Sequence, residues 1–210
     1  MSFAEHATLH DTPVPFNVRI NTMTIHRILL MGNEHLKRVS APVDDPSSPA
    51  VAALVDDLLD TINSVDGNGL AAPQVGVNLR VVVYRVPAHR IPAGARQQPV
   101  PWTTLINPVL TPLDDEKRPI WERCQSLPNL YGRVPRYNHI RLTYTTLSGE
   151  SQTRVARGYH AMLLQHECDH LDGVLYPMRM TDMRDLAFVS ELMPDGRDFF
   201  SYTAAQFDGD

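Results

Sequence analysis

The segment Gln165-His166-Glu167-Cys168-Asp169-His170 constrains this chain more than any other. On an α-helix, residues four positions apart lie on one face with their Cβ atoms about 5–6 Å apart, so His166 and His170 are placed to hold one metal ion. Glu167 would then point toward that ion without binding it, which is the position of a general base for a metal-activated water. The alternative interpretation is an ordinary helix that carries two surface histidines.

The composition is that of a globular protein. A chain of 210 residues with 43% hydrophobic and 20% charged residues is long enough for one domain with a substantial core. Its formal net charge of −5 and its lack of a basic run argue against nucleic-acid binding through phosphate contacts. Since no apolar stretch approaches the roughly 18 residues that a membrane span needs, we expect neither nucleic acid nor a membrane as a partner.

The ends of the chain and its two cysteines indicate where the protein works. Residues 1–22 lack both the apolar core of a signal peptide and the basic character of a transit peptide. We therefore expect a reducing compartment, the cytoplasm, in which Cys124 and Cys168 stay unpaired. We divide the chain into a poorly ordered extension at 1–22, a single domain at 23–194 and a tail at 195–210.

Apolar spacing and turn residues predict a mixture of helices and strands. Ser48-Pro49 is typical of a helix start, and apolar residues recur at helical spacing until Asp66-Gly67. We expect strands over 79–86 and 103–110, a long loop over 87–101, and a hairpin with strands at about 140–146 and 152–156. Helices are expected over 159–171, which carries the histidines, and from about 182 to 192.

A catalytic site of this kind needs a third protein ligand beside the two histidines. A metzincin protease would have a third histidine at position 176, but that residue is Tyr176. Glu191, twenty-one residues after His170, would serve in a thermolysin-like protease, and this alternative stays open. Cys168 projects to roughly the opposite side of the helix from His166 and is expected to pack as a small hydrophobic residue. Cys124, at a predicted strand-to-loop transition, is the best thiolate partner for the pair.

Three segments of the chain share the order and spacing of a known set of motifs. They are Gly67-Asn68-Gly69-Leu70-Ala71-Ala72-Pro73-Gln74, Glu122-Arg123-Cys124-Gln125-Ser126-Leu127-Pro128 and Gln165-His166-Glu167-Cys168-Asp169-His170-Leu171. Together they resemble the motifs of the peptide deformylase family, over about residues 25–180. The resemblance implies an α+β fold in which antiparallel sheets surround a central metal-binding helix, with a further C-terminal helix. It also implies metal-dependent hydrolysis of the N-formyl group from the formyl-methionine of nascent polypeptides, met at the ribosome, with release of formate.

The resemblance also implies a role for individual residues. One divalent metal ion, most commonly Fe²⁺ with Zn²⁺, Ni²⁺ or Co²⁺ as substitutes, would be held by Cys124, His166 and His170. Glu167 would accept a proton from the attacking water and return it to the departing amine. The side-chain amide of Gln74 and the backbone N–H of Gln125 would stabilise the tetrahedral oxyanion. A thiolate ligand donates more charge than a third imidazole would, which suits a ferrous site and predicts sensitivity to oxidation.

Helix geometry also indicates where the substrate would bind. Tyr159, Met162 and Leu163 lie seven, four and three residues before His166, on its side of the helix. We expect them to line a pocket for the methionine side chain, together with Gly69 from the small-residue loop. For Leu163, ordinary core packing is an equal alternative.

Three positions depart from the family pattern. Arg123 stands where the family usually has Gly, Gln125 where it usually has Leu, and Asn68 where an apolar residue is common. The Arg123 guanidinium could reach the mouth of the cleft and pair with a carboxylate on a substrate. A second hypothesis is therefore an amidohydrolase that acts on a different N-acyl substrate. A third, a metal-binding protein without catalysis, is argued against by Glu167, because a structural metal site needs no base.

Overall fold

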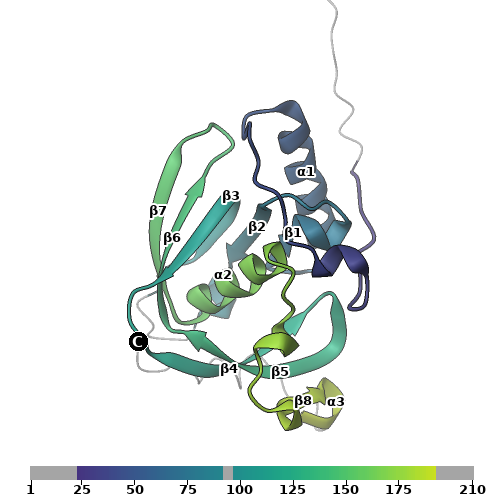
Figure 1. Ribbon diagram of the computed structural model, residues 1–210, viewed down its shortest axis with the longest axis vertical. Coiled ribbons are helices and arrows are strands. Elements are labelled where there is room, and N and C mark those ends of the chain that lie inside the picture. The colour runs from purple at the N-terminus through teal and green to yellow at the C-terminus, as the bar shows by residue number, and fades with distance from the viewer. Residues whose placement is uncertain (1–22, 92–96, 193–210) are drawn as a thin grey trace, which may run out of the picture.

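The computed structural model describes residues 23–91 and 97–192 (Figure 1). Our expectations for residues 1–22 and for the tail at 195–210 lie outside the described residues. The helices within the described ranges are α1 (Pro49–Ser64), α2 (Gly158–Leu171) and α3 (Val189–Leu192), with short 3₁₀ turns at η1 (Glu34–Lys37), η2 (Ala72–Val75), η3 (Ala88–Arg90), η4 (Tyr176–Arg179) and η5 (Met183–Asp185). None of the described helices is long and apolar enough to cross a membrane.

The described strands form two antiparallel sheets. The strands are β1 (Gly69–Ala71), β2 (Val81–Val86), β3 (Val100–Pro112), β4 (Lys117–Cys124), β5 (Leu127–Tyr137), β6 (His139–Thr145), β7 (Ser151–Arg157) and β8 (Leu186–Phe188). The larger sheet has the order β1-β2-β3-β6-β7, and the smaller sheet has the order β4-β5-β8. The α+β fold with antiparallel sheets and a C-terminal helix is confirmed.

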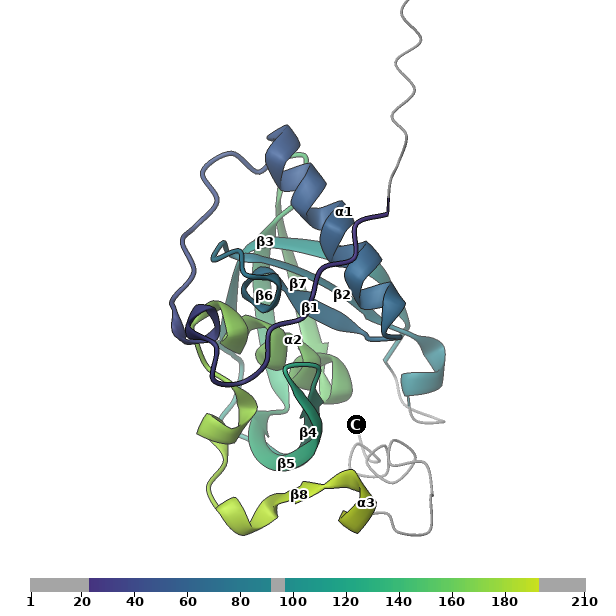
Figure 2. The same cartoon turned by 90° about the vertical axis from the view of Figure 1, so that its right-hand side faces the viewer.

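Helix α2 lies between the two sheets, whereas α1 covers the opposite face of the larger sheet (Figures 1 and 2). The alternation of side chains along β2 explains this arrangement, because successive residues of a strand point to opposite faces. Tyr84 and its even-numbered neighbours pack with Met162 of α2, and Val83 packs with Leu58 and Ile62 of α1. The strand is apolar throughout because both of its faces are buried.

The start of α1 follows the sequence prediction closely. The Ser48 side-chain oxygen accepts a hydrogen bond from the backbone N–H of Val51 at 3.4 Å, and Pro49 occupies the first helical position. After the helix, Asp66 takes a positive φ of 49°. This turn leads directly into β1, so that the small-residue segment 67–74 runs beneath α2.

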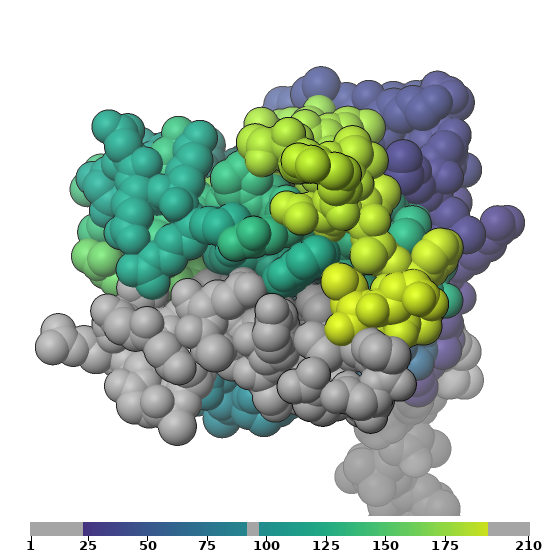
Figure 3. Space-filling view, turned by 90° about the horizontal axis from the view of Figure 1, so that it is seen from below, coloured from purple at the N-terminus to yellow at the C-terminus, as the bar shows by residue number. Residues whose placement is uncertain are grey.

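Two predicted segments differ from the structure. The helix expected from about 182 is instead η5, then β8, and only then the short α3; β8 pairs with β5 through Leu130 and Phe188. A strand of three residues carries too short an apolar pattern to be distinguished from a helix by periodicity. The loop expected over 87–101 contains η3 and gives way to β3 at Val100, while residues 92–96 lie outside the described part. Seen from below, the segment 176–192 lies across the smaller sheet (Figure 3).

Candidate metal centre

Three donor atoms from two elements converge beneath the smaller sheet. Helix α2 supplies His166 and His170, and the end of β4 supplies Cys124. The Cys124 Sγ atom lies 3.3 Å from His170 Nε2, and one ligand atom from each of the three buried residues lies within 4.8 Å of the others. One thiolate and two imidazoles are the donor set that iron and zinc accept in proteins. The residues present therefore fit a transition-metal ion, and the structure brings together the three residues that were predicted as its ligands.

The tautomer of His166 is fixed by a buried carboxylate. Glu122 Oε2 accepts a hydrogen bond from His166 Nδ1 at 2.8 Å, so the Nε2 atom of the ring is left for the metal. Burial opposes ionisation of Glu122, but the Arg136 guanidinium and the hydrogen bond with His166 together outweigh burial and lower the pKa of Glu122 to about 2. Glu122 is thus ionised, accepts a hydrogen bond from the imidazole N–H, and holds the ring in its ligating orientation.

Arg136 in turn links this carboxylate to helix α2. Its Nε and Nη2 atoms lie 2.6 and 3.0 Å from the two oxygens of Glu122, while Nη1 lies 2.6 Å from Asp169 Oδ2. The other oxygen of Asp169 accepts from Arg179 Nη2 at 2.8 Å. This ion-pair chain joins β4, β5, α2 and η4 around the metal ligands. Sequence reasoning did not find it, because these residues are far apart in the chain and form no local pattern.

The environment of Cys124 favours the thiolate form that metals bind. Burial alone would raise the pKa of Cys124, but the neighbouring His170 and His166 outweigh burial and hold that pKa well below its usual range. The backbone N–H of Ser126 also donates to Sγ at 3.4 Å. Cys168, by contrast, is buried and unpaired on another side of the helix, as expected of a packed small residue.

The buried amide of Gln74 is held with its nitrogen toward the site. Its Oε1 atom accepts from the backbone N–H of Ala71 at 2.9 Å, and its Nε2 atom donates to Ser126 Oγ at 3.2 Å and lies 3.6 Å from Cys124 Sγ. The sequence analysis did not single out Ser126 for a role of its own, just as it did not find the ion-pair chain around Arg136. Gln125 lies in the turn after Cys124 and lines the same pocket.

Glu167 is buried against the small-residue loop. A Cβ atom at Gly69 would lie 2.2 Å from Glu167 Oε1, so only glycine allows β1 to approach this carboxyl group so closely. Burial raises the pKa of Glu167 to about 7, against the opposing effect of His166 and His170. Its Oε2 atom has no hydrogen-bond partner among the described residues. A carboxyl group with a pKa near neutrality can both accept and release a proton.

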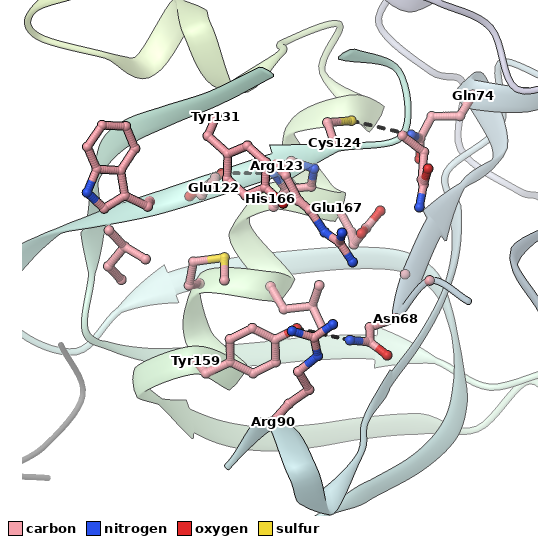
Figure 4. A pocket seen from close by; sticks show the side chains of 17 residues that line it. Asn68, Gln74, Arg90, Glu122, Arg123, Cys124, Tyr131, Tyr159, His166 and Glu167 are labelled. Carbon is pink, nitrogen blue, oxygen red and sulfur yellow. Dashed lines mark hydrogen bonds and ion pairs between the residues drawn. The ribbon is translucent and has the colours of Figure 1, made fainter. Parts of the chain in front are cut away.

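A pocket opens beside these residues (Figure 4). Its walls include every residue predicted to contact substrate: Gly69, Arg123, Tyr159, Met162 and Leu163. Leu163 and Met162 also belong to the hydrophobic core, so the core-packing alternative for Leu163 holds together with the pocket. Ile120 and Trp121 add apolar surface, and the Asn68 side-chain nitrogen donates to Tyr159 Oη at 3.3 Å. Arg90, which lies in η3 within the predicted loop, is a pocket residue that sequence reasoning missed.

The thermolysin-like alternative required Glu191 as third ligand. Glu191 is exposed in α3, on the side of the smaller sheet where β8 lies, and it is not part of the group that gathers around His166 and His170. That alternative is not favoured, because the segment before Glu191 is a strand paired with β5 rather than a helix packed on α2.

Comparisons with known proteins agree with this geometry. Residues 25–185 match the family model described as polypeptide deformylase. The chain is 43% identical over 170 residues to peptide deformylase 1 of Nitrosomonas europaea, which covers 81% of this chain and 96% of that protein. It is 45% identical over 172 residues to peptide deformylase 1 of Bordetella pertussis, with the same coverage.

Solved structures give the same result. The class I type b peptide deformylase from Acinetobacter baumannii, bound to Met-Ala-Ser, is similar with a TM-score of 0.68 and 30% identity, over 76% of this chain and 100% of that one. The peptide deformylase from Ehrlichia chaffeensis has a TM-score of 0.70 and 28% identity, over 77% of this chain and 91% of that one.

Proposed function

Because this chain belongs to the polypeptide deformylase family, we propose that the site around Cys124, His166, His170 and Glu167 carries the reaction of that family. The chain is a metal-dependent hydrolase that removes the N-formyl group from nascent polypeptides. The observation that carries our assignment of residues is the convergence of three buried donor atoms within 4.8 Å of one another. Neither a different N-acyl substrate nor a thermolysin-like protease is favoured, since the relatives are named peptide deformylases.

We assign one divalent ion, Fe²⁺, to Cys124 Sγ and to the Nε2 atoms of His166 and His170, with Zn²⁺, Ni²⁺ or Co²⁺ able to replace it. When bound, the ion supplies Lewis-acid chemistry, polarising a carbonyl oxygen and making a water molecule more acidic. The choice of iron rests on the thiolate, whose charge donation suits a ferrous ion. The His166–Glu122 hydrogen bond supports His166 as a metal ligand, since such partners orient ligands and raise their basicity.

The chain's own residues move the proton and stabilise charge. Glu167 accepts a proton from the water whose oxygen adds to the formyl carbon, and it later gives that proton to the amine nitrogen as the C–N bond breaks. The products are formate and a free N-terminal amine. The Gln74 Nε2 group and the backbone N–H of Gln125 donate to the formyl oxygen as it becomes negative. The Ala71–Gln74 hydrogen bond supports this role because it fixes the amide in advance.

The methionine side chain occupies the apolar part of the pocket. Tyr159, Met162 and Leu163 from α2 and Trp121 from β4 supply its walls. An unbranched thioether fills such an irregular apolar pocket well.

We place the enzyme in the cytoplasm, where it acts on formylated chains as they leave the ribosome. We assign the whole site to a single domain at 23–194.

Formate release by protein purified without oxygen tests this function. Formyl-Met-Ala-Ser should be hydrolysed and acetyl-Met-Ala-Ser should not, because Gly69 approaches Glu167 so closely that we expect little room beside this base for an added methyl group. The matched variant is Glu167→Gln, which keeps the size of the side chain and removes its basicity. It should retain the metal and lose at least about a hundredfold in kcat. Full activity in this variant would contradict the role of Glu167.

A further inference from the structure

The mouth of the substrate pocket carries two arginines that come from different parts of the chain. Arg123 precedes the ligand Cys124 on β4, and Arg90 lies in η3, which follows strand β2 of the larger sheet. Both line the pocket (Figure 4). Arg123 is exposed between two buried neighbours, Glu122 and Cys124, as the alternation of a strand requires. Its guanidinium is therefore presented to solvent at the pocket and not to the metal ligands.

The carboxylates that line this pocket do not neutralise Arg123. They are Glu122, which is already bound by Arg136, and Glu167, which is buried against Gly69. Arg123 makes no hydrogen bond or ion pair with any other residue of the described ranges 23–91 and 97–192. A guanidinium in this state is available to a ligand without first breaking an internal pair.

The polar rim of the pocket consists of Arg90, Arg123, Asn68 and the hydroxyl group of Tyr159. The Asn68 side-chain nitrogen donates to that hydroxyl group at 3.3 Å. The pKa of Tyr159 is raised by burial, while the positive charges of Arg90 and Arg123 both act to lower it. Both guanidinium groups therefore lie close enough to act on one hydroxyl. Their fields add at the same part of the pocket, which is the part that a negatively charged group would enter.

We propose that Arg123, assisted by Arg90, makes this enzyme select formylated peptides that carry a carboxylate next to the formyl-methionine. This inference rests on the proposed function, because the methionine side chain must occupy the apolar wall for the following residue to reach the mouth. Two sources supply the carboxylate. One is the side chain of Asp or Glu as the second residue, and the other is the terminal carboxylate of a formylated dipeptide.

The expected effect is moderate because Arg123 is exposed. A solvent-accessible ion pair gives about a three- to fivefold gain in kcat/KM at low salt. It should appear mainly in KM, since the carboxylate binds away from the reacting bond and in the ground state as well. It should also shrink as salt is added, because the screening length falls from about 10 Å at 0.1 M to about 3 Å at 1 M.

The test uses the metal-loaded enzyme and four substrates in two matched pairs. Formyl-Met-Glu-amide is compared with formyl-Met-Gln-amide, and formyl-Met-Ala with its C-terminal amide. We expect the acid to exceed its neutral partner in at least one pair, and the pair that responds identifies the source of the carboxylate. Equal rates in both pairs, with formate released from every peptide, would overturn this inference and leave the proposed function intact. No formate from any of the four would instead overturn the proposed function.

Substitutions then assign the preference to the rim. In Arg123→Gln the acid-to-neutral ratio should fall to about one, and in Arg90→Gln it should fall partway. The control is Arg133→Gln, which removes the same charge from an exposed position on β5, opposite Trp121, outside the pocket. This control should keep the wild-type ratio. An equal loss of preference in Arg133→Gln would show that net charge, not the rim, is responsible.

Binding of the deformylated products gives a readout that does not depend on turnover. Calorimetry should show that Met-Glu-amide binds the wild-type enzyme about three- to fivefold more tightly than Met-Gln-amide, and that Arg123→Gln abolishes the difference. Equal binding of the two products by the wild-type enzyme would contradict recognition of a side-chain carboxylate by Arg123.

Discussion

Glu122 Oε2 lies 2.8 Å from His166 Nδ1, and this contact links the smaller sheet to the metal ligands on α2. It is buried, and the far side of the carboxylate is held by Arg136. The metal ligand is therefore oriented by a residue that does not itself bind the ion. This arrangement allows the strength of metal binding to be changed without touching a ligand.

Replacing Glu122 by Gln should weaken metal binding. The neutral amide cannot hold both Arg136 and the His166 proton as a carboxylate does, so we expect a loss of about 10- to 100-fold in metal affinity. Competition with a chelator of known affinity measures it. The control is Glu116→Gln, because Glu116 is exposed and pairs with Arg118 on the surface. Unchanged affinity in Glu122→Gln would show that the hydrogen bond does not orient His166.

Replacing Gly69 by Ala should displace Glu167. The added Cβ atom would lie 2.2 Å from Glu167 Oε1, so the carboxyl group must move by about 1 Å or more, and a shift of that size costs about a hundredfold in rate. We expect lower kcat with normal metal content. Gly149→Ala is the control for backbone strain, since Gly149 has a φ of +81° and a Cβ atom added there would meet no atom within 4 Å. Activity lost equally in both variants would contradict a local clash with Glu167.

Replacing Asp169 by Asn should lower the free energy of unfolding by more than the same change at a carboxylate that forms a surface ion pair. Asp169 bridges Arg136 and Arg179, and its loss leaves the buried Arg136 short of a partner, at a cost of about 3–5 kcal/mol. The control is Asp172→Asn, three residues further on, where the half-exposed carboxylate pairs with Arg80 and contributes about 0–1 kcal/mol. Urea unfolding of both variants gives the comparison, and equal losses would contradict it.

Acid should destabilise the protein through His160. Its ring stacks on Tyr84, and burial, followed by the charge of Arg154, lowers the pKa of His160 to about 4. In the unfolded chain this histidine is protonated near pH 6.5. As the pH is lowered from 6.5 to 4, the unfolded state therefore binds more protons than the folded state, and the free energy of unfolding decreases. The loss reaches about 3 kcal/mol at most.

Unfolding measured across this pH range checks the prediction. His160→Asn should reduce the pH dependence between pH 6.5 and 4, even if its stability at neutral pH is lower. His89→Asn, at an exposed position, serves as the control and should keep the wild-type slope. If His160→Asn also keeps that slope, another group controls the loss of stability in acid.

The sequence predicted the parts of the structure that depend on local pattern. Ser48 and Pro49 determine the start of α1, and the four-residue spacing of His166 and His170 places them on one face of α2. The partners of these residues could not be read in the same way. Glu122, Arg136 and Asp169 meet only when β4, β5 and α2 pack together, and nothing in the spacing of these three residues indicates it.

The C-terminal segment illustrates the same limit. Leu186–Phe188 is a strand because β5 offers it an edge, and its own pattern of apolar residues suits a helix equally well. Arg90 was missed because it lies in a segment rich in Pro and Gly, whose composition indicates a loop and says nothing of where the loop passes. In both cases the deciding contact comes from a distant element.

The metal content of Cys124→Ala tests the central claim most directly. Protein purified without oxygen should contain one iron ion per chain, and Cys124→Ala should retain well under a tenth of it, because two imidazoles alone bind a divalent ion weakly. Cys168→Ala, which removes the other buried thiol of the same chain, should keep the full amount. Full metal content in Cys124→Ala, or an equal loss in Cys168→Ala, would contradict the site made of Cys124, His166 and His170.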